Sequence, residues 1–276
     1  MWLTNSSIGR KLVMAITGAC LILFVTFHCV MNSVAILWPK AYNDICLFLG
    51  ANWYALVASM GLAALFIIHI IYAVWLTLQN RKARGADRYA VTSKPAQVEW
   101  ASQNMLVLGI VIVAFLVLHL VQFWSKMQLA ELMGNHVPDP ANGIYFINEA
   151  FSCWITPVCY VIGFVALWFH MTHGFWSMFQ SAGWDNNIWM PRLKCIGNWW
   201  TSIVIVLFLA QAAVFTIRAN GACDCPVSTE WNALSNEATS CPLVKIEKSC
   251  CGNHEAACEG HSKGECAGAC HNHTNE

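Results

Sequence analysis

Charged residues are scarce in this sequence of 276 residues: they make up 11% of it, whereas soluble domains carry about 25%. Neither sign is in excess, because fifteen Lys and Arg balance fifteen Asp and Glu. A nucleic-acid or strongly acidic partner would call for a basic field, so this balance argues against both. Hydrophobic residues reach 57%, which excludes an ordinary soluble globular protein.

Charge is also missing from the interiors of five long apolar stretches. A helix needs about 20 apolar residues to cross a bilayer, and a lone strand could not satisfy its backbone polar groups in lipid. We therefore expect an all-α membrane protein in which five transmembrane helices form a bundle. The expected spans are about 12–38, 53–79, 104–126, 150–180 and 199–217.

The basic residues of the loops predict the orientation of the bundle. One side carries nine of them: two before the first span, five in the 80–103 loop and two in the 181–198 loop. The opposite side has only Lys40, Lys126 and Arg218 close to span ends. By the positive-inside rule, the N-terminus is expected in the cytoplasm and the C-terminal tail outside. We divide the chain into a transmembrane domain, 1–218, and a tail, 219–276.

The tail concentrates the residues that the spans have little of. It holds eight of the fourteen cysteines and four of the ten histidines. Its Gly, Asn, Ser and Glu content favours a flexible, disordered appendage. Thiolates and imidazoles at this density would also suit Zn²⁺ or Cu⁺, and an even number of cysteines outside the cell could form disulfides. The six cysteines in or near the spans are interpreted as small core residues.

Histidine occurs in four of the five spans, at His28, His69, His119 and the pair His170/His173. An ionisable residue within a span is rare and is a functional candidate by default. The plain alternative is a core imidazole that bonds to a neighbouring carbonyl or hydroxyl. Because the spans contain no carboxylate for a proton relay, the shared feature favours metal or haem ligation.

Depth along the spans, at about 1.5 Å per residue, sorts these histidines into two levels. His28 and His119 fall in the outer half of the bilayer, and His69 and His173 in the inner half. We therefore predict two stacked haems, each held by two facing imidazoles between apolar walls. Zinc would lack ligands at either level, and the spans have no Cys-x-x-Cys-His motif for covalent haem c.

Several short motifs resemble a known family. They are Ser6-Ser7-Ile8-Gly9-Arg10-Lys11, Thr17-Gly18, His28, and the run His173-Gly174-Phe175-Trp176-Ser177-Met178-Phe179-Gln180. Together they resemble the cytochrome b subunit of succinate:quinone oxidoreductases, of the five-helix, two-haem type. The resemblance covers about residues 1–218. It implies axial pairs His28/His119 and His69/His173, because the fourth-span ligand is the histidine that precedes glycine; His170, one turn earlier, is the substitute.

What the resemblance implies is an electron-transfer subunit without a catalytic site of its own. Such a subunit anchors a flavoprotein and an iron–sulfur subunit on the cytoplasmic face of a bacterial inner membrane. Electrons pass between the iron–sulfur clusters, two haem b groups and menaquinone or another quinone, during either succinate oxidation or fumarate reduction. The chain supplies no flavin or dicarboxylate site, so it would not oxidise succinate alone.

The proton chemistry of such a subunit is less clearly marked in the sequence. Some fumarate reductases of this type carry a glutamate two residues before the fourth-span histidine, and this chain has Met171 there. The polar candidates for proton exchange with a quinone beside the outer haem, which are also ordinary loop residues, are Asp44, Glu131, His136 and Glu149. The basic residues that could pair with propionates of the inner haem, or serve only topology, are Arg10, Lys11 and Arg81.

Three other hypotheses remain open from the sequence. A di-haem cytochrome b anchor of a hydrogenase or formate dehydrogenase would differ in its soluble partner. A metal-transporting membrane protein, with the tail as metal sensor, would bind no haem. A structural membrane anchor with satisfied core histidines would bind no cofactor and would tolerate His→Ala changes.

Overall fold

The computed structural model describes residues 6–50, 52–84, 100–134, 138–221 and 226–235. Within these residues the chain is helical and contains no strand. Five helices are long and apolar enough to cross a membrane, which confirms the prediction of an all-α, multi-pass membrane protein. They are α2 (Ser7–Leu37), α4 (Trp53–Arg84), α5 (Trp100–His119) with its π-helical continuation η1 (Leu120–Trp124), α8 (Ile155–Ser181) and α9 (Trp189–Ala219).

Several helices extend beyond the apolar stretches that predicted them. The α2 helix begins at Ser7, where the Ser6 side chain caps it by accepting a hydrogen bond from the Gly9 amide at 2.8 Å. The α9 helix begins at Trp189, ten residues before the expected span, and carries Arg192 and Lys194 in its first turns. Apolar length measures the part of a helix that lies in lipid, so it underestimates a helix that continues into water.

The fourth predicted stretch, 150–180, is divided in the structure. Its first residues belong to a separate short helix, α7 (Gly143–Phe151), and α8 starts only at Ile155. The side chain of Asn142 begins α7 by accepting a hydrogen bond from the Tyr145 amide. A turn at 152–154 then separates the two helices. Hydropathy continues across that turn, which is why the sequence predicted one long span.

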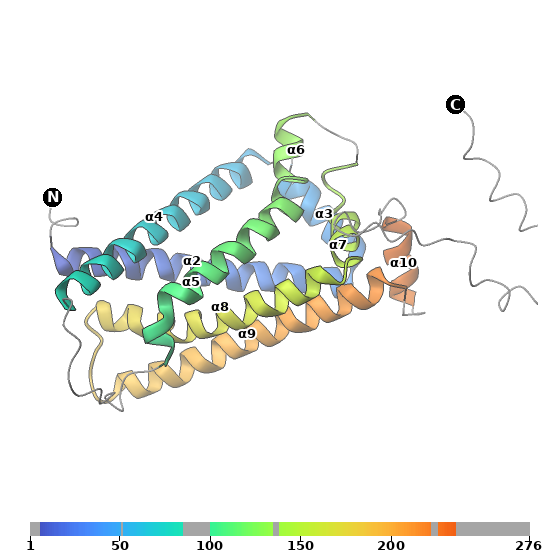
Figure 1. Cartoon of the computed structure of the whole chain (residues 1–276). Coiled ribbons are helices and arrows are strands. Elements are labelled where there is room, and N and C mark those ends of the chain that lie inside the picture. Colours follow the sequence, from blue (N-terminus) through green and yellow to red (C-terminus); the bar gives the residue numbers. More distant parts are fainter. Residues whose placement is uncertain (1–5, 51, 85–99, 135–137, 222–225, 236–276) are drawn as a thin grey trace, which may run out of the picture.

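The long helices pack unevenly. The pair α8 and α9 runs side by side, α2 and α5 pack against α8, and α4 packs mainly on α2 (Figure 1). In α4, no residue of the most apolar 18-residue window is buried inside the chain. Large side chains such as Ile67, Ile71 and Leu78 are exposed along it. Exposed apolar surface of this extent suits a lipid environment and not water.

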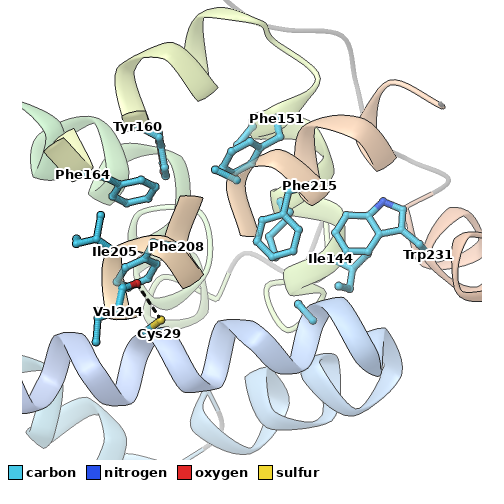
Figure 2. Close-up of a cluster of buried hydrophobic side chains, with 14 residues drawn as sticks. Cys29, Ile144, Phe151, Tyr160, Phe164, Val204, Ile205, Phe208, Phe215 and Trp231 are labelled. Atoms are coloured by element: carbon cyan, nitrogen blue, oxygen red, sulfur yellow. Dashed lines mark hydrogen bonds between the residues drawn. The ribbon is translucent and has the colours of Figure 1, made fainter. Parts of the chain in front are cut away.

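Four shorter elements gather at one end of the bundle, here called the α10 end. They are α3 (Pro39–Gly50), α6 (Gln128–Leu132), α7 and α10 (Pro226–Leu234) (Figure 1). Trp231 of α10 is completely buried, and its ring stacks on Phe215 at 5.7 Å. Figure 2 shows the Trp231 ring beside Phe215 and Ile144. Its indole nitrogen donates to Asn148 Oδ1 at 3.3 Å, and the Arg218 guanidinium lies 5.3 Å from its ring.

Helix α10 corrects one expectation for the tail. Residues 226–234 were expected to be disordered with the rest of 219–276, but they form a helix that α3 and α7 contact. One tryptophan provides enough apolar surface to hold a short helix against the bundle, although the composition of the whole tail is polar. Residues 222–225 and 236–276 lie outside the described residues, and together they contain all eight cysteines and all four histidines of the tail.

The described cysteines differ in redox state. Cys20, Cys29, Cys46, Cys159 and Cys195 carry free thiols, whereas Cys153, at the α10 end, is disulfide-bonded. The interpretation as a small core residue fails for Cys195, which is exposed. It holds for the burial of Cys153, at 3% exposure, but it did not include the disulfide. Sequence spacing cannot identify a disulfide, because pairing depends on which distant segment folds alongside.

Candidate functional site

Two of the span histidines face each other in the half of the bundle nearer the α10 end. The ring centroids of His28 in α2 and His119 in α5 lie 5.7 Å apart, with the ring planes almost perpendicular at 88°. Phe24 stacks on the His28 ring at 5.5 Å, and Phe123 lies 5.1 Å from the His119 ring. The sequence-predicted outer pair is thus brought together, and aromatic side chains form its walls.

A chain of polar side chains extends from His119. Its Nδ1 lies 3.0 Å from the hydroxyl oxygen of Tyr160, and this hydroxyl donates to Gln122 Oε1 at 3.0 Å. The Gln122 amide in turn donates to Thr156 at 3.0 Å. Because Tyr160 has only one proton and gives it to Gln122, its oxygen accepts the hydrogen bond from Nδ1–H of His119. This leaves the lone pair of His119 on Nε2.

The other ring of this pair connects to the short helix α3. The Asn32 amide lies 3.3 Å from His28 Nε2 and donates to the His28 carbonyl at 2.8 Å. The Tyr42 hydroxyl donates to Asn32 Oδ1 at 3.3 Å. Burial raises the pKa of Tyr42 well above its usual 10, so the hydroxyl keeps its proton and remains a donor throughout the physiological range.

A second pair of imidazoles forms nearer the opposite end of the bundle. His69 in α4 faces His170 in α8, with ring centroids 6.3 Å apart and an interplanar angle of 64°. His69 Nδ1 lies 3.1 Å from the hydroxyl oxygen of Thr17. Nδ1 of His170 is buried, and no described residue bonds to it.

The sequence assigned the α8 ligand to His173, with His170 as the substitute, and this choice remains a prediction. The His173 ring packs edge-on against Trp176 at 4.7 Å. The ammonium group of Lys194, a residue of α9, lies 4.1 Å from the centre of the Trp176 ring. His173 therefore lies one turn beyond His170, beside an aromatic and cationic group at the end of the bundle.

The spacing of both pairs is compatible with one metal ion between the rings of each. A metal–nitrogen bond is about 2 Å and a ring centre lies roughly 1 Å behind its nitrogen, so two ligating imidazoles have centres about 6 Å apart. The observed separations are 5.7 Å and 6.3 Å. Edge-to-face ring contacts fall in the same range. The ring separation alone therefore fits both a shared metal ion and plain ring packing.

Small residues lie next to two of the inner-level histidines. A Cβ atom added at half-buried Gly174, which follows His173, would have no other atom within 4 Å. At Gly18, the same added atom would lie 3.6 Å from Cε1 of His69. The described residues also contain no group of three or more His, Cys, Asp or Glu side chains that would suit zinc. Two imidazoles with an apolar surround and adjacent space fit a haem.

The polar candidates at the α10 end have separate environments. Asp44 lines a cavity of 450 Å³ together with Leu47, Phe48, Asn52 and Trp53. Glu149 forms an ion pair with Lys126 at 2.5 Å. Glu131 lies in the short helix α6, and His136 lies outside the described residues.

The remaining residues named from the sequence lie toward the opposite end. Arg10 in α2 stacks over Trp75 of α4 at 5.5 Å. Lys11 lies in the first turns of α2, and Arg81 lies near the end of α4. Met171 is buried at 4% exposure, so the structure places an apolar side chain at this position within α8.

Sequence reasoning did not single out the hydroxyl partners of the histidines. Thr17 appeared only as part of a motif, and neither Gln122 nor Tyr160 was considered. Gln122 lies three residues after His119, which puts it on the same face of the helix. A polar residue one turn from a membrane histidine is a signal that could have found it.

Comparisons with protein-family models, with curated proteins and with solved structures found no match for this chain. A functional assignment therefore has to come from the chemistry of the two imidazole pairs. Facing imidazoles in an apolar bundle can hold iron in a haem, and they cannot by themselves bind a dicarboxylate or a flavin.

Proposed function

We propose that the chain is the di-haem cytochrome b membrane-anchor subunit of a succinate:quinone oxidoreductase. In this role it passes electrons between an iron–sulfur subunit and menaquinone or another quinone in the membrane. The observation that carries the proposal is the presence of two facing imidazole pairs at two levels of one apolar bundle. A structural anchor would need neither the pairing nor the two levels.

His28 and His119 would hold the outer haem. The inner haem would be held by His69 of α4 together with one histidine of α8, either His173 or His170. When bound, haem supplies a reversible one-electron couple between ferric and ferrous iron. The chain supplies the ligands and a water-poor surround. Phe24, Phe123 and Phe208 contribute this surround at the outer level. Burial and ligand hydrogen bonding are the two means by which such a protein tunes a haem potential.

The two histidine levels lie within one bilayer thickness of each other, so a single chain can hold a haem at each level. Thr17 contacts His69 and therefore marks the inner level on α2, while His28 marks the outer level on the same helix. Eleven residues separate these two positions, which corresponds to about 16 Å along a helix. This is about half of the roughly 30 Å hydrocarbon thickness of a bilayer.

We propose that the α10 end faces outward and that the opposite end faces the cytoplasm of a bacterium. Nine basic residues in the N-terminal segment and two loops favour this orientation. The disulfide at Cys153 supports it independently, because structural disulfides persist in oxidising compartments. The flavoprotein and the iron–sulfur subunit would then bind at the cytoplasmic end.

The quinone would react at the outer level in this arrangement. The cavity beside Asp44 is bordered by α3 and the start of α4. From α3, the Tyr42 hydroxyl donates to Asn32, whose amide donates to the His28 carbonyl. This polar connection joins the turn of α2 that carries His28 to the helix that lines the cavity, which supports a quinone site at the outer level.

Haem content and partner subunits test the proposal directly. We expect the detergent-extracted complex to contain about two non-covalent b-type haems per chain, reducible by succinate or by a menaquinol analogue. Co-purified flavoprotein and iron–sulfur subunits would distinguish it from a hydrogenase or formate dehydrogenase anchor. A complex without haem would contradict the proposal and would favour the metal-transport hypothesis.

A further inference from the structure

One buried hydroxyl contacts each imidazole pair, and both hydroxyls meet the same ring atom. Thr17 lies beside Nδ1 of His69, and Tyr160 lies beside Nδ1 of His119. On the basis of the proposed function, we propose that Thr17 and Tyr160 are positioning residues, one for each haem. Each hydroxyl oxygen accepts a hydrogen bond from Nδ1–H and so presents Nε2 of the histidine to the iron.

The direction of the bond at Thr17 follows from its other partners. Thr17 is 4% exposed, and its hydroxyl donates to the Val13 carbonyl at 2.9 Å, with the Met14 carbonyl at 3.1 Å. The single hydroxyl proton is therefore used within α2. The 3.1 Å contact with His69 then needs a proton from the ring. Gly18, next to Thr17, borders the same ring, because a Cβ added there would lie in ordinary van der Waals contact, 3.6 Å from His69 Cε1.

Tyr160 achieves the same result from different helices. Its hydroxyl donates to Gln122 Oε1, so its oxygen is available to accept from His119. The ring is held in place by edge-to-face contacts with Phe115 at 4.9 Å and Phe164 at 5.8 Å. At the inner level the acceptor is on α2 and the ligand on α4, whereas at the outer level the acceptor is on α8 and the ligand on α5. Two hydrogen bonds between different pairs of helices therefore favour the same tautomer, in which Nδ1 carries the proton.

Such a bond has two physical consequences for a ligating histidine. It selects the tautomer with its lone pair on Nε2, and it restrains the rotation of the ring. It also raises the basicity of the imidazole, which stabilises ferric over ferrous iron. Loss of the acceptor should therefore raise the midpoint potential of the haem concerned and weaken haem binding, with a cost of about 10- to 100-fold in affinity.

The test uses the intact, haem-loaded complex and four substitutions. Thr17→Val removes the hydroxyl at nearly constant shape, Thr17→Ser keeps it, and Tyr160→Phe removes only the phenolic oxygen. The matched control for Thr17 is Thr26→Val, because Thr26 is on the same helix and donates to Ile22 in the same way without contacting an imidazole nitrogen in the described structure. Redox titration followed by optical spectra gives the potential of each haem separately.

We expect Thr17→Val to raise the potential of the inner haem only, and Tyr160→Phe that of the outer haem only. Thr17→Ser should restore the wild-type value, and Thr26→Val should leave both potentials unchanged. If Tyr160→Phe does not assemble, Gln122→Met replaces it. Without Gln122 Oε1 to take its proton, the Tyr160 hydroxyl is a weaker acceptor for Nδ1–H of His119, so the outer potential should also rise.

The outcomes separate this inference from the proposed function. Wild-type complex without haem would overturn the proposed function itself. Wild-type complex with two haems, but with unshifted potentials in both Thr17→Val and Tyr160→Phe, would overturn only the positioning roles. Shifts of both haems in each variant, or an equal shift in Thr26→Val, would indicate general loosening of the bundle and would also overturn them.

Discussion

The rings of His28 and His119 lie 5.7 Å apart although they belong to α2 and α5, two helices that each make most of their contacts elsewhere. Their meeting is therefore not a by-product of a tight α2–α5 interface. Aromatic side chains surround the pair, and a polar chain leads away from each of its members. This arrangement makes the pair the clearest target for mutation.

Replacing either member of this pair should remove one haem. We expect His28→Ala and His119→Ala each to lower the haem content from about two to about one per chain, because one imidazole cannot hold the iron axially from both sides. Pyridine haemochrome analysis of the purified variants measures this. Phe27→Ala is the control, since Phe27 precedes His28 but is 54% exposed. Retention of both haems in His28→Ala would contradict the assignment.

The inner level can be tested in the same way, and this test also identifies which histidine of α8 is the ligand. We expect His69→Ala to lose the inner haem, and only one of His170→Ala and His173→Ala to do so. The ring facing His69 belongs to His170, whereas the sequence resemblance implies His173. Low-temperature optical spectra, which separate the two haems, decide between them. Normal spectra in both α8 variants would exclude an α8 ligand.

Trp231 should contribute strongly to the stability of the α10 end. It is fully buried, it stacks on Phe215, and Asn148 accepts its hydrogen bond. We expect Trp231→Ala to lower the free energy of unfolding by about 3–5 kcal/mol, the usual cost of removing a buried aromatic side chain. Thermal unfolding in detergent measures the change. Trp38→Ala, at a 62% exposed position of the same end, should have little effect.

The Cys46 thiol gives a pH-dependent signal at the same end. Burial raises its pKa from the usual 9.0 to about 11. The folded state thus favours the neutral thiol, so its contribution to stability is complete below pH 9 and is lost as the pH rises through 11. We expect alkylation of Cys46 to remain slow until the pH approaches 11, while exposed Cys195 reacts first. Rapid alkylation at pH 8, read by mass spectrometry of the folded protein, would disagree with a buried thiol.

Orientation can be measured with the same exposed cysteine. Cys195 lies near the start of α9, at the end opposite α10. We expect a membrane-impermeant maleimide to label it only after the cells are permeabilised. Lys40→Cys, at an exposed position of α3, should be labelled in intact cells. The reverse labelling pattern would invert the proposed topology.

Much of the architecture could be predicted because it depends on local properties of the chain. Long apolar runs without charge identified all five candidate membrane helices. The histidine positions along them predicted two pairs, of which the structure brings His28 and His119 together, whereas the ring that faces His69 is that of His170. The break between α7 and α8 was missed because hydropathy is continuous across it. Helix α10 was missed because one buried tryptophan does not change the average composition of a polar tail.

The amino-acid sequence by itself determined the helical class and the five long apolar helices, which follow from apolar length, and it predicted two depths of histidine from the rise per residue. Tertiary structure decided which rings face each other, which hydroxyl each Nδ1 meets, and that Cys153 is disulfide-bonded. The reason is rotational: neighbouring residues on a helix differ by about 100° in direction. Whether His170 or His173 faces His69 therefore depends on how α8 is turned against its neighbours, which only packing determines.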